Sequence, residues 1–98
     1  MITVTAFFDV KPDCRDKFIR LACDCARNSR REKGNLSYKV YAQRNNGSQF
    51  TFIEEWVNDA AIEMHSRAAH FQSFIAMSAT FLNSEPVIEQ LTTVASVG

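Results

Sequence analysis

The sequence predicts a single α+β domain over residues 1–98, with its elements in the order β-α-β-β-α-β. Four short segments rich in β-branched and aromatic residues are typical of strands. Two longer segments between them carry apolar residues at spacings of three and four, which indicates amphipathic helices. A length of 98 residues with 46% hydrophobic side chains fits one globular domain.

The first strand is expected over residues 2–10, and the Lys-Pro-Asp run that follows it begins a helix reaching about Lys33. Gly34 then stands where a helix commonly ends in a glycine cap. The last turn is rich in basic residues, which suit the negative end of the helix dipole or form an anion site. The apolar stripe of this helix consists of Cys14, Phe18, Leu21, Ala22, Cys25 and Ala26.

A hairpin is expected from residues 35–44 and 50–56, joined at the Asn-Asn-Gly turn signal of residues 45–47. A three-residue loop makes one face apolar and aromatic, whereas a two-residue loop would scatter the apolar residues over both faces. That face then holds one carboxylate, Glu54, among apolar and aromatic side chains. The expected cross-strand pairs are Val40 with Phe52, Tyr38 with Glu54, and Leu36 with Trp56.

Asn58 is expected to cap a second helix, with Ser66 as a possible point of interruption. Its sheet-facing side should carry Ala61, Met64, His65 and Ala68, and a later stripe continues with Phe71, Phe74, Ile75, Ser78 and Phe81. A last strand is expected over residues 87–94. This order is the ferredoxin-like plan, an antiparallel four-stranded sheet with both helices on one face. The helix-free face is apolar enough to predict a homodimer.

Charge and cysteine content exclude several classes of function. Eleven basic and eleven acidic residues cancel, so nucleic acid and membrane surfaces are not expected partners. No apolar run reaches the length of a membrane span, and no signal-peptide pattern is present. The three cysteines, Cys14, Cys23 and Cys25, fit no zinc or redox spacing, which favours reduced thiols in a cytoplasmic protein. A regulatory thiol is the alternative.

His65 and Glu54 are the predicted catalytic residues. A histidine beside a carboxylate in an apolar cleft can act as a general base near neutral pH. The alternative for His65 is a core histidine bonded to a backbone carbonyl. A buried Glu54 requires a partner, for which His65 and His70 are the candidates, unless a strand twist brings it to solvent.

Aromatic side chains near these two residues predict either a substrate pocket or plain core packing. The proposed substrate-binding residues are Tyr38, Phe52, Trp56, His70 and Phe74. His65 and His70 are five positions apart, whereas metal pairs on helices use three or four, and no third ligand stands at a suitable spacing. The sequence therefore predicts no metal site.

The chain resembles the antibiotic biosynthesis monooxygenase domain family over nearly its whole length. The matching motifs are G-N-L-S-Y at residues 34–38, F-x-x-x-E-x-W at residues 50–56, A-x-x-x-H at residues 61–65, and H-F at residues 70–71. The resemblance implies a dimeric α+β barrel with a pocket between sheet and helices. It also implies oxidation of a small quinol or phenol by O₂ without metal, flavin or haem, with His65 as base and Glu54 as its partner.

Two other functions remain open at this point. Similar proteins include an isomerase that moves a proton next to a carbonyl in a small phosphorylated compound, and His65 would again be the base. Such a substrate requires a phosphate-binding group, for which Arg67 is the only candidate near the pocket. The third possibility is a module that binds a small ligand without turnover.

Overall fold

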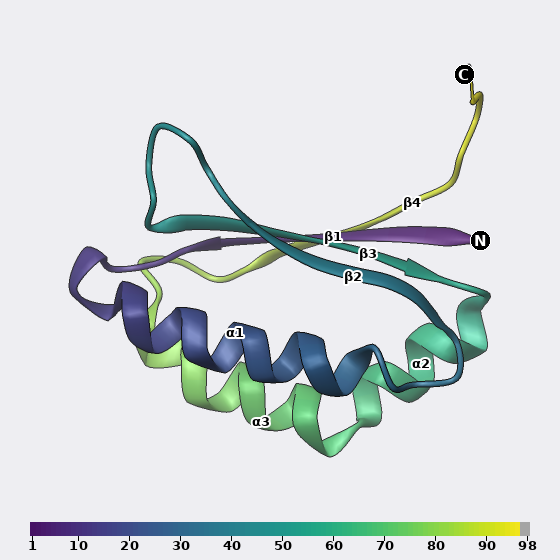
Figure 1. Cartoon of the computed structure of the whole chain (residues 1–98), viewed down its shortest axis with the longest axis horizontal. Coiled ribbons are helices and arrows are strands. Elements are labelled where there is room, and N and C mark those ends of the chain that lie inside the picture. The colour runs from purple at the N-terminus through teal and green to yellow at the C-terminus, as the bar shows by residue number, and fades with distance from the viewer. Residues whose placement is uncertain (97–98) are drawn as a thin grey trace.

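The computed structural model describes residues 1–96, and the last two residues of the predicted domain lie outside this part. A four-stranded antiparallel sheet forms one layer, and the helices cover one of its faces (Figure 1). The sheet order is β2-β3-β1-β4. The strands are β1 (Ile2–Asp9), β2 (Asn35–Ala42), β3 (Gln49–Trp56) and β4 (Val87–Leu91). The helices are α1 (Arg15–Ser29), α2 (Asp59–Arg67) and α3 (Ala69–Ser78), with 3₁₀ turns η1 (Pro12–Cys14) and η2 (Ala79–Phe81).

The predicted α+β class and ferredoxin-like element order are therefore confirmed. The core lies between the sheet and the helices, where five phenylalanine rings pack with centroid separations of 4.7–6.2 Å. Each buried aromatic ring removes a large apolar area from water, and this burial favours folding. The five are Phe8, Phe18, Phe50, Phe52 and Phe74.

The register of the β2–β3 hairpin agrees with the sequence in its central part. Tyr38 lies opposite Glu54, and Val40 lies opposite Phe52, as expected. The prediction for Leu36 is wrong, because an irregularity between Asn35 and Ser37 places Asn35 opposite Trp56. Such a bulge removes one residue from the ladder, and Leu36 is consequently 55% exposed. Strand β2 ends at Ala42, two residues earlier than expected, and β3 begins at Gln49, so the loop covers residues 43–48 rather than 45–47.

Helix α1 ends at Ser29, before the expected Lys33, and a turn connects it to β2. Arg30 stabilises this turn by donating two hydrogen bonds from its guanidinium group to the Tyr38 carbonyl oxygen, at 3.0 and 2.7 Å. Gly34 is not a left-handed helix cap, since no described residue has a positive φ. Its role is close approach: a Cβ atom at this position would lie 2.2 Å from the Cβ of Ala61 on α2.

The second helical segment is divided in two at Ala68, whose backbone is extended (φ −65°, ψ 140°). Asn58 caps α2 as predicted, because its side chain accepts a hydrogen bond from the Ala61 N–H at 2.9 Å. Ala61 and His65 are buried against the sheet. Met64 was expected on the same side but is 72% exposed, since α2 is short and presents only a narrow stripe to the sheet.

The face of the sheet opposite the helices carries exposed apolar side chains. Tyr41, Ile53, Val87 and Leu91 are between 38% and 53% exposed there. Strand β4 is shorter than the predicted 87–94 and all five of its residues are exposed. Within residues 1–96, no helix is both long and apolar enough to cross a membrane.

Candidate active site

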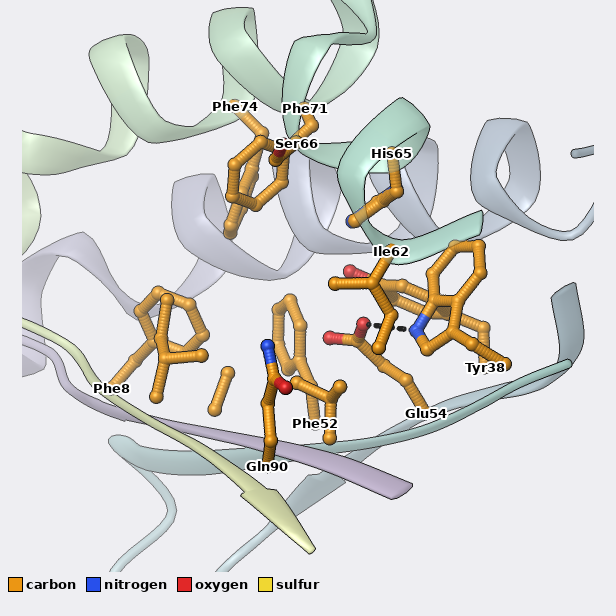
Figure 2. A pocket seen from close by; sticks show the side chains of 14 residues that line it. Phe8, Tyr38, Phe52, Glu54, Ile62, His65, Ser66, Phe71, Phe74 and Gln90 are labelled. Carbon is orange, nitrogen blue, oxygen red and sulfur yellow. Dashed lines mark hydrogen bonds between the residues drawn. The ribbon is translucent and has the colours of Figure 1, made fainter. Parts of the chain in front are cut away.

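A cavity of about 200 Å³ lies between the sheet and helices α2 and α3 (Figure 2). Its wall is mainly apolar, with a small number of polar side chains, which is usual for a site that binds a small organic molecule. His65 projects into this region from α2, above Glu54 and Tyr38 on the sheet (Figure 2). The lining residues are Val4, Ala6, Phe8, Tyr38, Phe52, Glu54, Trp56, Ile62, His65, Ser66, Phe71, Phe74, Ile88 and Gln90.

Six of the seven predicted site residues line this cavity, and His70 does not. His70 lies at the start of α3 and is turned toward Glu32. Its imidazole is 5.9 Å from that of His65, measured between ring centroids. The prediction that His70 contacts substrate therefore finds no support in the cavity.

Glu54 is buried in the cavity wall and is only 4% exposed. Its Oε1 atom accepts a hydrogen bond from the indole Nε1–H of Trp56 at 3.0 Å. Neither of the predicted partners, His65 and His70, forms a hydrogen bond with Glu54. Its partner is Trp56, which lies on the same face of β3. Burial raises the pKa of Glu54 to about 7, although the hydrogen bond from Trp56 opposes this shift. A protonated fraction of Glu54 is therefore present at neutral pH.

His65 is also buried, and its ring packs against the rings of Trp56 and Phe71 with centroid distances of 4.6 and 4.7 Å. Its Nδ1 atom lies 2.7 Å from Oε2 of Glu32. Its Nε2 atom is buried without any hydrogen-bond partner. Burial lowers the pKa of His65, and Glu32 only partly offsets the effect. The ring is thus neutral at pH 7, and the contact with Glu32 is a hydrogen bond rather than an ion pair.

Glu32 was not predicted from the sequence. It stands in the basic run after α1, and the same Oε2 atom that contacts His65 lies 2.9 Å from Nε2 of His70. The contact of Glu32 with His65 follows from the close approach of Gly34 to Ala61. His65 lies one turn beyond Ala61 on α2, so the residues just before Gly34 lie beside His65. The close approach itself, however, is visible only in three dimensions.

Glu32, His65 and His70 bring three possible metal-ligand atoms within 4.8 Å of one another. The sequence prediction of no metal rested on the lack of a third ligand and on the spacing of five, and both reasons fail in the folded chain. The two hydrogen bonds to Oε2 account for the arrangement of all three side chains. Glu32, His65 and His70 therefore form a hydrogen-bonded group, the Glu32 triad.

A second polar group lies behind Tyr38. The Tyr38 hydroxyl is 3.7 Å from the Cys25 sulfur, which is 3.9 Å from the Ser29 hydroxyl. Burial raises the pKa of both the Cys25 thiol and the Tyr38 hydroxyl, so both remain protonated at neutral pH. Tyr38 can therefore serve as a hydrogen-bonding or packing group, but not as an anion. The cysteines are all free thiols, as expected.

The cavity combines a neutral imidazole, a carboxyl group that titrates near neutrality, and aromatic walls. A base with a free lone pair next to a proton donor can remove a proton from a bound hydroxyl group and stabilise the resulting anion. The aromatic walls favour a flat, electron-rich molecule.

Comparison with known proteins identifies relatives of this chain. The model of the family described as antibiotic biosynthesis monooxygenase matches residues 1–77. The candidate monooxygenase YcnE of Bacillus subtilis (strain 168) is 33% identical over 84 residues, which is 86% of this chain and 88% of YcnE. Among solved structures, PA3566 of Pseudomonas aeruginosa is 30% identical, with a TM-score of 0.88 and coverage of 96% of this chain and 94% of that one. A crystal structure of an antibiotic biosynthesis monooxygenase shares the fold, with a TM-score of 0.93 at 24% identity over 97% of this chain and 100% of that one.

Proposed function

Because the chain belongs to the antibiotic biosynthesis monooxygenase family, we propose that it oxidises a small aromatic quinol or phenol with O₂. The observation that carries this proposal is the buried, unpartnered Nε2 atom of His65 beside an aromatic cavity. An unsatisfied buried acceptor costs about 1–3 kcal/mol, and a substrate hydroxyl that donates to it recovers this free energy.

The reaction requires only residues that the site contains. His65 Nε2 takes the proton of the substrate O–H, and the resulting oxyanion is electron-rich enough to reduce O₂ directly. One oxygen atom enters the ring and the other leaves as water, so a phenol plus O₂ gives a quinone plus water. The protonated form of Glu54 donates a hydrogen bond to an oxygen of the substrate. On this proposal no metal, flavin or haem takes part.

The proposal is tested by O₂ uptake with 1,4-naphthohydroquinone, using the di-O-methyl ether as a substrate that lacks the acidic proton. Labelled ¹⁸O₂ should place one heavy atom in the product, and the ether should give no uptake. Uptake without incorporation would mean a simple oxidase and would contradict the proposal. Binding without any uptake would mean a ligand-binding module.

Replacing His65 by Gln should lower turnover by about a hundred- to ten-thousand-fold, because proton removal by a positioned base contributes a factor of this size. Met64→Gln is the matched control, since Met64 is the adjacent residue on α2 but points to solvent. The melting temperature of both variants should stay close to that of the wild type. Unchanged turnover with a lowered melting temperature in His65→Gln would show that His65 is structural.

The charge of the cavity disfavours the isomerase function. Its lining residues in the described chain include no Lys or Arg. Arg67, the candidate for binding phosphate, pairs with Glu63 on the outer surface of α2, and both side chains are more than half exposed. A phosphate group in the cavity would find no cation, and it would lie beside the buried Glu54 carboxyl group.

We also propose that two chains associate through the helix-free face of the sheet. Tyr41, Ile53, Val87 and Leu91 expose apolar surface there, and a second copy would cover it. Light scattering at micromolar concentration should give twice the mass of the chain, and Ile53→Lys should shift it toward the monomer. A monomeric wild type at this concentration would contradict the proposal.

A further inference from the structure

The Glu32 triad holds His65 through its Nδ1 atom, from outside the cavity. Oε2 of Glu32 is 2.7 Å from Nδ1 of His65 and 2.9 Å from Nε2 of His70. Neither Glu32 nor His70 lines the cavity. Both are partly buried, with side chains that are 17% and 23% exposed. Glu32 and His70 can therefore influence the protonation of His65 without contacting a molecule bound in the cavity.

The position of one carboxylate oxygen between two imidazoles determines which ring nitrogens carry a proton. A carboxylate accepts hydrogen bonds and donates none, so each nitrogen that faces it must carry a proton. A neutral imidazole has only one N–H, and a proton on Nδ1 of His65 leaves the lone pair on Nε2. Nε2 is the atom that the structure leaves without a partner.

We propose that Glu32 is a positioning residue, which fixes His65 in the Nδ1–H tautomer, and that His70 holds the Glu32 carboxylate in place for this task. Its effect on turnover rests on the proposed function, whereas its effect on the tautomer does not.

The other neighbours of His65 cannot set the tautomer. Trp56 and Phe71 pack against its ring and so constrain the ring plane, but they present no acceptor to Nδ1. Glu54 is bonded to the Trp56 indole. Within residues 1–96, Glu32 is the only hydrogen-bond partner that His65 has through its side chain.

The break in the helix at Ala68 makes the contribution of His70 possible. On one continuous helix, residues five apart lie about 140° from each other around the axis and do not share a partner. Because Ala68 is extended, α3 begins with a new direction, and His70 turns back toward Glu32. Three separate elements thus meet at one oxygen atom: the turn after α1, α2 and α3.

The tautomer can be read directly by ¹⁵N NMR of the imidazole rings, because the chain has only two histidines. His65 in the wild type should show a protonated Nδ1 and an unprotonated Nε2 at neutral pH, with assignment from His70→Gln. Glu32→Met, which keeps the length of the side chain but replaces the carboxylate with a thioether that is only a weak acceptor, should give a mixture of tautomers. Glu63→Met removes an exposed carboxylate from α2 and should leave the His65 signals unchanged.

Turnover should fall in the variants in which His65 loses the Nδ1–H tautomer. For histidines that bind metals, removing the hydrogen-bond partner of the second ring nitrogen typically costs about 10- to 100-fold in activity, and by analogy we expect a loss of this size for Glu32→Met. His70→Ala should lose about threefold to tenfold, the equivalent of one hydrogen bond. His70→Gln should recover most of that loss, because its amide N–H can still donate to Glu32. If Glu32→Met does not fold, the pair of His70 variants still tests the proposal.

An Nε2–H tautomer in the wild type, or an unchanged tautomer in Glu32→Met, would overturn the assignment. A changed tautomer with unchanged turnover would overturn the catalytic importance of Glu32. If the wild type shows the Nδ1–H tautomer but no O₂ uptake with any quinol, the positioning role stands and the proposed monooxygenation fails.

Discussion

Two glutamates stand near His65, and their surroundings differ in nearly every respect. Glu54 forms part of the cavity wall on a central strand, is 4% exposed, and accepts a hydrogen bond from a neutral indole. Glu32 lies behind the cavity in a turn, is more accessible, and binds two imidazoles through one oxygen. Burial raises the pKa of Glu54 to about 7. The same side-chain type thus provides a carboxyl group that is partly protonated near neutral pH in the cavity wall, and a hydrogen-bond acceptor for His65 behind it.

The hydrogen bonds and burial of a carboxyl group thus depend on whether it lies on a central strand or in a turn. A residue on a central strand is desolvated by the core, and its charged form becomes costly. A residue in a turn keeps some contact with water and can gather hydrogen-bond donors from several elements. Each of the following experiments alters one side of this comparison and leaves the other as its reference.

The largest expected effect is a pH-dependent gain in stability for Glu54→Gln. Burial raises the pKa of Glu54 from 4.5 to about 7, so the folded wild type keeps a proton that the unfolded chain releases in this window. Stability that is present below the unfolded pKa is therefore lost as the pH rises through the folded pKa. Gln cannot ionise, so its free energy of unfolding should improve relative to wild type by about 3 kcal/mol between about pH 4 and pH 8.

Urea unfolding followed by circular dichroism across this pH range measures the difference. His65, whose pKa is lowered by burial, gives a pH dependence of opposite sign, but it is common to both proteins and cancels in the comparison. Glu63→Gln, on the exposed side of α2, should show a nearly constant difference from wild type. A constant difference for Glu54→Gln as well would mean that Glu54 titrates normally.

The second largest effect is expected for a loss of stability caused by a change in the turn that contains Glu32. Gly34→Ala should cost about 1–3 kcal/mol, because its Cβ would lie 2.2 Å from that of Ala61 and must push β2 away from α2. The same displacement should disturb the His65–Glu32 hydrogen bond and so the ¹⁵N signals of His65. Gly47→Ala is the control, since its Cβ would meet only the flexible Arg15 side chain, at 3.3 Å.

A second change separates overpacking from other causes. Ala61→Gly removes the clashing Cβ, so a double-mutant cycle between positions 34 and 61 should show favourable coupling. Additive free energies would argue against the close approach as the reason for Gly34.

The smallest effect is expected for Trp56→Phe, which removes the indole N–H from Glu54 while keeping an aromatic ring. Since this hydrogen bond lowers the pKa of Glu54, its loss should raise the titration midpoint by roughly one pH unit, or about 1.4 kcal/mol. Carbon-13 NMR of the Glu54 carboxyl group follows the midpoint. The His65 tautomer should not change, and a change there would mean that the two sides of the site are coupled.

The sequence predicted best what depends on local periodicity. The alternation of residues 35–56 was enough to place Tyr38 opposite Glu54 and to put Phe52 and Trp56 on the helix-facing side of the sheet. Turn chemistry at Asn58 gave the start of α2. These features depend on residues that are close in the sequence, and they are visible as a repeat of apolar residues every two positions in strands or every 3.6 positions in helices.

The missed features depend on contacts between separate elements. Glu32 lies in an aperiodic turn, and its partners come from two helices, so no pattern in its own segment indicates them. The extended Ala68 changes the direction of His70, although alanine is a strong helix former. The bulge at residues 35–37, which exposes Leu36, likewise contains no glycine or proline from which it could have been predicted.

The strand order also determines how late in folding the site is completed. Strand β1 lies between β3 and β4, and its register pairs Thr3 with Leu91, so residues that are far apart in the sequence must meet to complete the sheet (Figure 1). Such distant pairing slows folding, because a long loop must close before any contact compensates the lost entropy. Ile88 and Gln90 of β4 line the cavity. Until β4 pairs with β1, the cavity wall lacks these two residues, so the surroundings of His65 are complete only after this long-range pairing has formed.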